Sequence, residues 1–191
     1  MHSAGAAVSS WESLAVSSES SGFEGLLTAR LSLRRPTPGD IAAILAIVGD
    51  PRASAHNPSD LLTSFAEAEG LYQFWDRQWR TTGLGYLVVR RRAGEETVGF
   101  CGVKIVRFRD ADALNLYYRL APSAWGEGIA SEAAAAVITW AESKKPELPI
   151  IARVSTENLA SQRVATKIGL HRAPHLDQTG PDGPELIFTS A

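Results

Sequence analysis

The fold of this chain is decided by the stretch Ala121-Pro122-Ser123-Ala124-Trp125-Gly126-Glu127-Gly128-Ile129-Ala130. It joins a predicted strand that ends at Leu120 to an amphipathic helix, whose apolar face collects Ile129, Ala133, Ala136, Val137 and Trp140. The first turn of a helix leaves N–H groups unpaired at an electropositive end, where a phosphate group fits. Gly126 and Gly128 lack Cβ atoms, so the backbone there can approach an anion closely. The stretch therefore predicts an anion-binding turn.

The glycine pattern of this turn is not specific by itself. It lacks the third glycine of the dinucleotide fingerprint, and no Gly-Lys-Ser/Thr follows, as it does in the phosphate loop of nucleotide hydrolases. A tight strand-to-helix connection with no ligand explains the pattern equally well. The surrounding sequence has to decide between these two interpretations.

Strand and helix patterns alternate along the rest of the chain. Alternating apolar residues predict strands, and apolar residues at helical spacing between Gly or Pro signals predict helices. We expect strands at 27–34, 85–91, 97–108, 113–120, 150–155 and 186–189, and helices at 41–48, 59–79 (with Gly70 as a candidate break), 125–143 and 158–168. This order predicts a mixed sheet with helices packed on it.

Four motifs in sequence order resemble the GNAT superfamily of N-acetyltransferases. Within it, they are most similar to the ribosomal-protein alanine N-acetyltransferases of the RimJ/RimL type. The motifs are Thr28–Arg34, Val98–Gly102, Trp125–Ala133, and Asn158–Val164 followed by Lys167–Leu170. The third matches the family's acetyl-CoA signature, Gln/Arg-x-x-Gly-x-Gly/Ala, and the fourth matches its Asn-x-x-Ser helix. The resemblance covers most of the chain from about Leu27 onward.

The resemblance implies an α/β fold whose mixed, mostly antiparallel twisted sheet has six to seven strands and about four helices. It places acetyl-CoA in a cleft between two splayed parallel strands, which end here near Leu120 and Ser155. The pantetheine arm would pair with the strand edge at 118–120, and the pyrophosphate would meet the N–H groups of 125–131. The implied cofactor-binding residues are Leu120, Trp125, Gly126, Glu127, Gly128, Ile129, Ala130, Ser131, Asn158, Ser161 and Arg163.

The chemistry implied by the resemblance needs a proton acceptor, because a free alkyl amine is mostly protonated at pH 7 before it attacks the thioester. A backbone N–H near the end of the strand would stabilise the oxyanion. The resemblance assigns to Ser161 the protonation of the departing thiolate. It assigns to Asn158, which also suits a helix N-cap, a contact with the pantetheine arm. Candidate proton acceptors are His175, Tyr117 or Tyr118, and water.

Two residues depart from the family pattern. Asn115 stands where relatives often carry a glutamate, and an amide cannot accept a proton near neutral pH. Glu127 stands where relatives usually carry Lys or Arg, and a carboxylate next to a pyrophosphate weakens binding unless it points outward. Arg163 and Lys167 are candidates to offset that charge near the 3′-phosphate, or they form a solvated helix face.

We therefore expect an acetyl-CoA-dependent N-acetyltransferase that acts on a primary amine within a ternary complex. The acceptor could be a protein N-terminus, an antibiotic or a small metabolite, and we expect it near the second helical region and the loop after Gly180. One alternative is a non-catalytic acyl-CoA-binding or regulatory module, which the missing glutamate at Asn115 would suit. Another is a nucleotide- or sugar-phosphate-binding domain. Homodimers occur among relatives, which leaves a homodimer open here.

Composition places the chain among ordinary globular proteins. Its 191 residues are 45% hydrophobic and carry 19 Lys and Arg against 21 Asp and Glu, so a net charge of −2 offers no general field for nucleic acid or a membrane surface. Scattered His residues and the single Cys101 predict neither a metal site nor a disulfide. Without a long apolar run or a secretory signal, we expect a cytoplasmic protein. Residues 1–22 are expected to form a flexible tail, and 23–191 a single domain.

Overall fold

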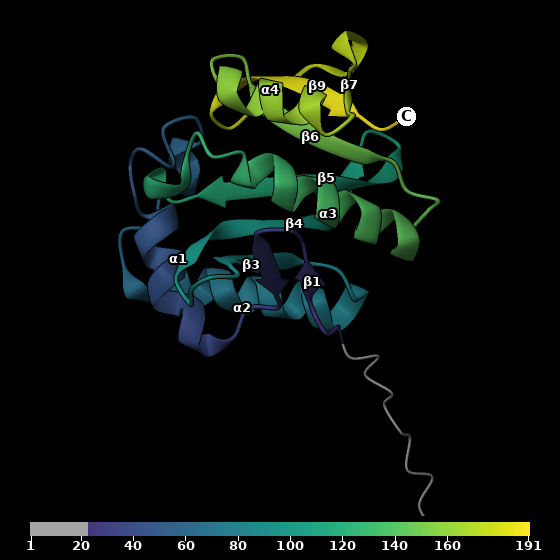
Figure 1. Cartoon of the computed structure of the whole chain (residues 1–191). Coiled ribbons are helices and arrows are strands. Elements are labelled where there is room, and N and C mark those ends of the chain that lie inside the picture. The colour runs from purple at the N-terminus through teal and green to yellow at the C-terminus, as the bar shows by residue number, and fades with distance from the viewer. Residues whose placement is uncertain (1–22) are drawn as a thin grey trace, which may run out of the picture.

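A nine-stranded sheet forms the centre of the molecule (Figure 1). The computed structural model describes residues 23–191, so the tail expected at 1–22 lies outside the described residues. The strand order is β1-β2-β3-β4-β5-β6-β9-β7, and β8 pairs with β9. The strands are β1 (Leu26–Leu27), β2 (Leu31–Arg34), β3 (Tyr86–Arg91), β4 (Thr97–Phe108), β5 (Ala111–Leu120), β6 (Ile150–Ser155), β7 (His171–Arg172), β8 (Gln178–Gly180) and β9 (Gly183–Thr189).

Four α-helices pack on this sheet: α1 (Ile41–Val48), α2 (Phe65–Thr82), α3 (Ile129–Lys144) and α4 (Leu159–Lys167). The start of α2 is fixed by a capping box, in which Ser64 and Glu67 satisfy each other's backbone N–H groups. Gly83 ends α2 with a positive φ of 69°. Gly70 does not interrupt this helix, because the apolar contacts on both sides of it outweigh the weak helix propensity of one glycine.

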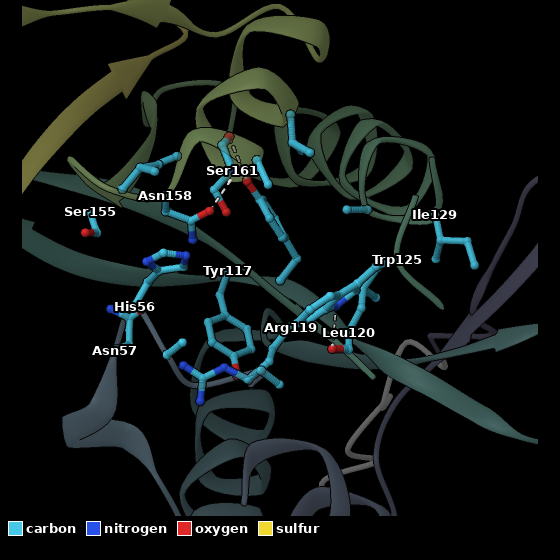
Figure 2. A pocket seen from close by; sticks show the side chains of 18 of the residues that line it. His56, Asn57, Tyr117, Arg119, Leu120, Trp125, Ile129, Ser155, Asn158 and Ser161 are labelled. Atoms are coloured by element: carbon cyan, nitrogen blue, oxygen red, sulfur yellow. Dashed lines mark hydrogen bonds between the residues drawn. The ribbon is translucent and has the colours of Figure 1, made fainter. Parts of the chain in front are cut away.

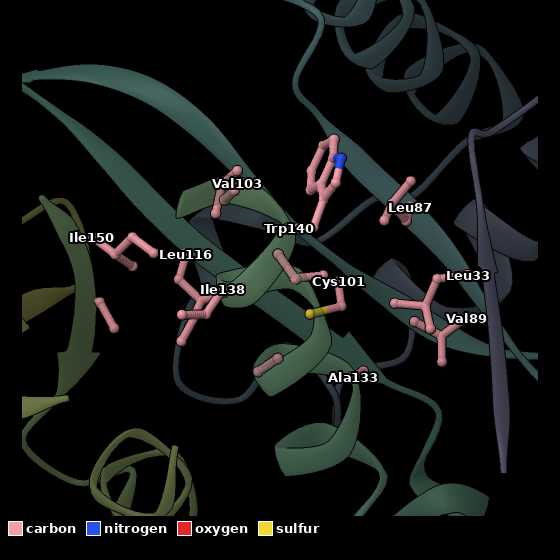
Figure 3. Close-up of a cluster of buried hydrophobic side chains, with 14 of the residues drawn as sticks. Leu33, Leu87, Val89, Cys101, Val103, Leu116, Ala133, Ile138, Trp140 and Ile150 are labelled. Carbon is pink, nitrogen blue, oxygen red and sulfur yellow. The ribbon is translucent and has the colours of Figure 1, made fainter. Parts of the chain in front are cut away.

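Side-chain alternation along the central strands divides the core between the two faces of the sheet. Leu87 and Val89 belong to the cluster that packs under α3, whereas Tyr86 and Val88, their neighbours in β3, belong to the cluster under α1 and α2. Figure 3 shows the first cluster, in which Trp140 and other residues of α3 lie over side chains from β2 to β6. The same alternation continues into β5 and decides which of its side chains face each side of the site.

The predicted splay between two parallel strands is confirmed. β5 and β6 form the parallel pair, and their register holds only at Leu114↔Ile150 and Asn115↔Ile151. Beyond these positions β5 runs on to Leu120 and β6 to Ser155 without pairing with each other. The other edge of each strand is paired, β5 with β4 and β6 with β9. A gap with an unpaired β5 edge therefore opens where the two strands end.

The remaining differences from the expected elements have local causes. The first strand is divided into β1 and β2, because the N–H of Thr28 bonds to the carbonyl of Leu31 in a turn. The helix expected from position 125 begins only at Ile129, since Gly126 and Gly128 adopt positive φ. The last strand is longer than expected and pairs with two short strands, β7 and β8, which were not predicted. Strands of two or three residues carry too little apolar periodicity to be found in the sequence.

Candidate active site

A cavity of about 770 Å³ lies at the gap between β5 and β6 (Figure 2). Its walls come from residues 116–120 of β5, residues 124–126 and 128–131 at the start of α3, residues 152–155 of β6, residues 158, 160, 161 and 164 around α4, and six residues of the segment 52–60 between α1 and α2. Figure 2 shows Asn158 and Ser161 on one wall, with His56, Tyr117 and Arg119 on the other. The volume is in the range of small-molecule sites. The cavity thus passes from one face of the sheet to the other through the gap.

The turn before α3 presents a row of unpaired donors to this cavity. Gly126 and Gly128 adopt φ values of 78° and 77°, and Gly128 is the N-cap of the helix. The first helical hydrogen bond runs from the N–H of Glu132 to the carbonyl of Gly128. Within residues 23–191, no oxygen accepts a hydrogen bond from the N–H groups of 126–131. This is the donor arrangement that binds phosphate at a helix N-terminus.

Glu127 lies outside the cavity, although its backbone belongs to the anion-binding turn. Its carboxylate accepts two hydrogen bonds from the guanidinium of Arg91, at 2.7 and 2.8 Å. The Arg30 Nη1 donates to the Glu127 carbonyl at 3.0 Å and so fixes the backbone of the turn. The bonds from Arg91 lower the pKa of Glu127, which keeps the carboxylate ionised and paired. The departure from the family pattern at this position is therefore compensated by Arg91.

Glu132 ties the start of α3 to the first strands. It accepts hydrogen bonds from the Thr28 hydroxyl at 2.5 Å, from the Arg30 backbone N–H at 2.9 Å and from Arg30 Nε at 2.6 Å. A carboxylate in the first turn also suits the positive end of the helix. These contacts explain why the motif Thr28–Arg34 occurs together with the turn before α3, because one supports the other.

Trp125 and Leu120 shape the entrance to the gap. The indole Nε1 of Trp125 donates to the carbonyl of Leu120 at 3.1 Å, while half of the Trp125 side chain stays exposed. On the β4 side, Gly99 lies so close to Leu120 that a Cβ there would overlap the Leu120 side chain and the Arg119 carbonyl. The end of β5 is therefore held from both sides, which fixes the position of its free edge.

Tyr118, Ser161 and Asn158 are brought together at the start of α4. The Tyr118 hydroxyl donates to the Ser161 carbonyl at 3.1 Å, and the Oδ1 of Asn158 accepts from the Ser161 N–H at 3.0 Å as the N-cap of α4. Burial raises the pKa of Tyr118 to about 12. The phenol therefore keeps its proton at neutral pH. The amide nitrogen of Asn158 stays free to donate to a group in the cavity.

The opposite wall consists mostly of residues that the sequence analysis did not select, and the exception is Tyr117, a candidate proton acceptor there. Tyr117 stacks on Tyr86 with ring centroids 4.6 Å apart. Arg119 is buried and donates to the Ser54 hydroxyl at 3.0 Å and to Asp60 at 2.9 Å, which fastens the 52–60 segment to β5. His56 projects from this segment toward the cavity (Figure 2). A signal for this wall in the sequence was Arg119, the one charged side chain in the strand predicted at 113–120.

Among residues 23–191, no group of three or more His, Cys, Asp and Glu is placed to hold a metal ion. In the same part of the chain, no helix has both the length and the apolar character needed to cross a membrane. The lining of the cavity offers backbone N–H groups, aromatic and hydroxyl side chains, and a small number of charges.

Comparisons with known proteins agree with this geometry. The family model "Acetyltransferase (GNAT) domain" matches residues 30–171. The chain belongs to this family. The N-acetyltransferase YoaA of Bacillus subtilis is 27% identical over 156 residues, 82% of this chain and 88% of that protein. An acetyltransferase of Agrobacterium tumefaciens has the same fold, with a TM-score of 0.75 and 24% identity over 88% of this chain and 94% of that one.

The same fold occurs in RimL, the ribosomal L7/L12 α-N-protein acetyltransferase, whose structure was solved in complex with coenzyme A. The TM-score is 0.70 at 16% identity, covering 85% of this chain and 94% of that chain. An identity this low shows a shared fold and does not assign this acetyltransferase to the RimJ/RimL branch.

Most of the residues predicted for the cofactor line the cavity of this acetyltransferase. They are Leu120, Trp125, Gly126, Gly128, Ile129, Ala130, Ser131, Asn158 and Ser161, joined by Tyr118. Glu127 and Arg163 do not line it. Arg163 and Lys167 instead line a separate depression on the surface of α4, together with Arg172 and Phe188.

The geometry does not favour His175 as the proton acceptor, nor an acceptor site at the second helical region and the loop after Gly180. His175 is exposed, does not line the cavity, and has its carbonyl bonded by Arg109. Asn115 is buried outside the cavity, so the amide at this position does not face the reacting groups. The loop after Gly180 reaches the cavity only indirectly, through hydrogen bonds from Ser59 to Asp182 at 2.9 and 2.6 Å. The wall opposite Asn158 and Ser161 includes the segment 52–60 and no residue of α2.

Proposed function

We propose that this acetyltransferase binds acetyl-CoA with the diphosphate on the N–H groups of 126–131, and acetylates a primary amine that enters from the opposite face of the sheet. One observation carries the proposal: a single cavity joins the unpaired donors of the turn to the gap between β5 and β6 and to the wall at 52–60. The pantetheine amides pair with the free edge of β5 as an added strand would. Coenzyme A bound to RimL supports this cofactor.

The two faces of β5 separate the two substrates. Leu116, Tyr118 and Leu120 share the face that packs against α3, where the cofactor enters. Tyr117 and Arg119 point to the other face, toward residues 52–60, where the acceptor amine enters. Direct transfer in a ternary complex then needs the thioester and the amine to meet in the gap between the strands.

In the transfer itself, the amine nitrogen forms a bond to the acetyl carbon, the carbon–sulfur bond breaks, and the sulfur leaves as a thiolate. A backbone N–H near Leu120 stabilises the oxyanion. The thiolate takes up a proton from Tyr118 or Ser161, which lie together at the start of α4. Because burial raises the pKa of Tyr118, the phenol keeps its proton at neutral pH and does not accept the proton of the amine.

We place the proton acceptor for the amine at His56 instead of His175. Histidine is the side chain whose charge ordinarily changes between pH 5 and 8, and His56 faces the cavity on the acceptor side. The imidazole takes the proton that the attacking amine loses, directly or through one water molecule. His175, the candidate selected from the sequence, does not face the cavity.

The likeness to RimL supports one particular class of acceptor amine. RimL is described as an α-N-protein acetyltransferase of ribosomal L7/L12. A protein N-terminus is therefore one acceptor to test, next to small amines. A non-catalytic acyl-CoA-binding module is the remaining alternative, and turnover separates it from an enzyme.

The test has two parts. Acetyl-CoA at millimolar concentration should raise the melting temperature of the full chain, because a ligand selective for the folded state stabilises it. A panel of amino acids, N-terminal peptides and small amines is then followed by release of the CoA thiol. No shift in melting temperature contradicts the cofactor assignment, and a shift without turnover on any amine favours the non-catalytic module.

The two histidines are compared in the same assay. His56→Gln should lower kcat/KM by roughly 10²- to 10⁴-fold, as loss of a general base does. His175→Gln should leave kcat/KM unchanged. The opposite pattern would return the role to His175, and no effect from either variant would leave water as the acceptor.

A further inference from the structure

The acceptor wall of the cavity combines side chains from two strands and one loop. The register Leu114↔Ile150 and Asn115↔Ile151 puts the odd-numbered residues of β5 and β6 on one face. Tyr117 and Arg119 therefore share a face with Arg153 and Ser155, and all of them line the cavity. This is the face that we assign to the acceptor amine, so the inference below rests on the proposed function.

The charges on this wall are predominantly positive. Among the described residues that line the cavity, the charged side chains are Arg52, Arg119 and Arg153, against one carboxylate, Asp60. Asp60 already accepts a hydrogen bond from the buried Arg119 at 2.9 Å. It is therefore not free to neutralise an incoming ammonium group on its own. A polycation would meet several like charges here and no uncommitted carboxylate.

Two of the three arginines are committed to partners. Arg119 bonds to Ser54 and Asp60, as described above. Arg52 makes a two-point contact with Asp50, at 3.1 and 2.7 Å, and it is largely exposed. Arg119 therefore holds the 52–60 segment in place, Arg52 is paired locally, and both guanidinium groups have little capacity for a ligand.

Arg153 is different. Its guanidinium donates no hydrogen bond within the described part of the chain, where its one ion pair is a long one with Glu185. The carboxylate nearest to it, Glu185, is 3.9 Å away, and the same Glu185 oxygen accepts a hydrogen bond from Gln178 at 2.8 Å. The positive charge of Arg153 also acts on its surroundings. Burial and Arg153 together lower the pKa of Lys104, which pairs in register with Asn115 of the adjacent strand β5.

We propose that Arg153 binds a carboxylate of the acceptor, so that the substrate is a primary amine carrying a carboxylate in the same molecule. A planar guanidinium with uncommitted donors matches a carboxylate in a two-point arrangement. The carboxylate can belong to a free amino acid or to an acidic side chain at a peptide N-terminus. Polycationic amines such as aminoglycosides and polyamines are poor substrates, because the wall repels them.

Matched acceptors test this inference. L-methionine is compared with L-methioninamide, and the peptide amide Asp-Ala with Asn-Ala, with kcat/KM measured by thiol release. The wild-type protein should prefer the carboxylate member of at least one pair by roughly tenfold or more, the discrimination expected of one charge-assisted contact. The first pair identifies a free amino acid as the substrate, and the second an acidic peptide N-terminus. Spermidine and kanamycin should react more slowly than either preferred compound.

The variant Arg153→Gln should abolish the preference while leaving KM for acetyl-CoA unchanged, and Arg153→Lys should retain part of it. Arg77→Gln, on the exposed surface of α2, removes the same charge away from the cavity and should retain the preference in full. Equal kcat/KM within both pairs, or a wild-type preference for the amides or the polycations, would overturn the inference.

A failure of the proposed function is recognised separately. If no amine releases thiol, the catalytic assignment fails, and calorimetry with CoA-saturated protein decides the present inference. The wild-type protein should then bind L-methionine or the Asp-Ala amide more tightly than its neutral counterpart, and Arg153→Gln should not. Equal binding of both members of each pair would contradict a carboxylate site at Arg153.

Discussion

Arg91 at the end of β3 holds Glu127 of the anion-binding turn in a two-point ion pair, although the two residues are 36 positions apart. The pair keeps a negative charge out of the cavity, although Glu127 belongs to the turn whose unpaired N–H groups we propose for the cofactor diphosphate. An acidic residue is tolerated here because a partner from another strand directs and neutralises it. The pairing makes the turn dependent on the hairpin between β3 and β4.

Removal of Arg91 should weaken cofactor binding through the freed carboxylate. Arg91→Ala should raise the Kd for acetyl-CoA several-fold at low salt, with a smaller effect at high salt, where exposed charges are screened. The effect should be much smaller when Glu127→Gln is already present, because the repelling charge is then gone. Isothermal titration of the two single variants and the double variant measures this coupling. Arg92→Ala removes the same charge from the next residue and serves as the control.

Two glycines in different surroundings should respond in opposite directions to alanine. A Cβ on Gly102 would overlap the backbone of Gly85 and Tyr86 in the neighbouring strand. Gly102→Ala should therefore reduce the free energy of unfolding by about 2 kcal/mol or more. Gly70 lies inside α2 with open space around it, so Gly70→Ala should increase that free energy by about 0.5–1 kcal/mol. Urea denaturation measures both, and destabilisation by both variants would contradict the account of Gly70.

The buried carboxylate of Asp40 should account for part of the decrease in the free energy of unfolding at acid pH. Burial alone would raise its pKa, but bonds from Arg34 and from the backbone and hydroxyl of Thr37 outweigh burial and lower the pKa below 3.8. The folded state therefore binds this proton less tightly than the unfolded state. The stabilisation is fully present well above pH 4 and is lost as the pH falls through 3.8 toward the lower folded value.

Asp40→Asn should lower the free energy of unfolding by about 3 kcal/mol at pH 7, because it leaves Arg34 without its buried partner. The difference from the wild-type protein should shrink as the pH falls through 3.8, because the unfolded wild-type chain then takes up the proton on Asp40 more readily than the folded protein does. Urea denaturation at a series of pH values tests this, and a difference that stays constant down to pH 3 would contradict the assignment.

The geometry of the half of the cavity that we propose for the cofactor could be predicted from the sequence, because its signals are local. Gly126 and Gly128 indicate the turn, and the apolar face beginning at Ile129 indicates the helix. Asn158 is an N-cap whose partner, the N–H of Ser161, lies three residues away. Each of these features depends on residues within one or two turns of the chain. The residues therefore lie in the structure where their motifs placed them.

The acceptor half could not be predicted in this way, since it depends on contacts between distant segments. Arg119 meets Asp60 across 59 positions, and this bond brings His56 to the gap. For Glu127 and His175 the sequence shows the type of side chain but not where it lies in the fold. The first is redirected by a partner far away in the chain, and the second has a suitable side chain but lies away from the cavity. Only the tertiary arrangement decides such cases.

The central claim is that the N–H groups of residues 126–131 bind the diphosphate of the cofactor. The measurement that tests it most directly is the Kd for CoA of Gly128→Asp against Gly128→Asn. The two variants place side chains of the same shape at the same positive φ and differ in charge. We predict that the Asp variant binds CoA at least tenfold more weakly, a difference of about 1.4 kcal/mol, whereas pantetheine, which lacks the diphosphate, does not distinguish the two. Equal Kd values for CoA in two folded variants would contradict the claim.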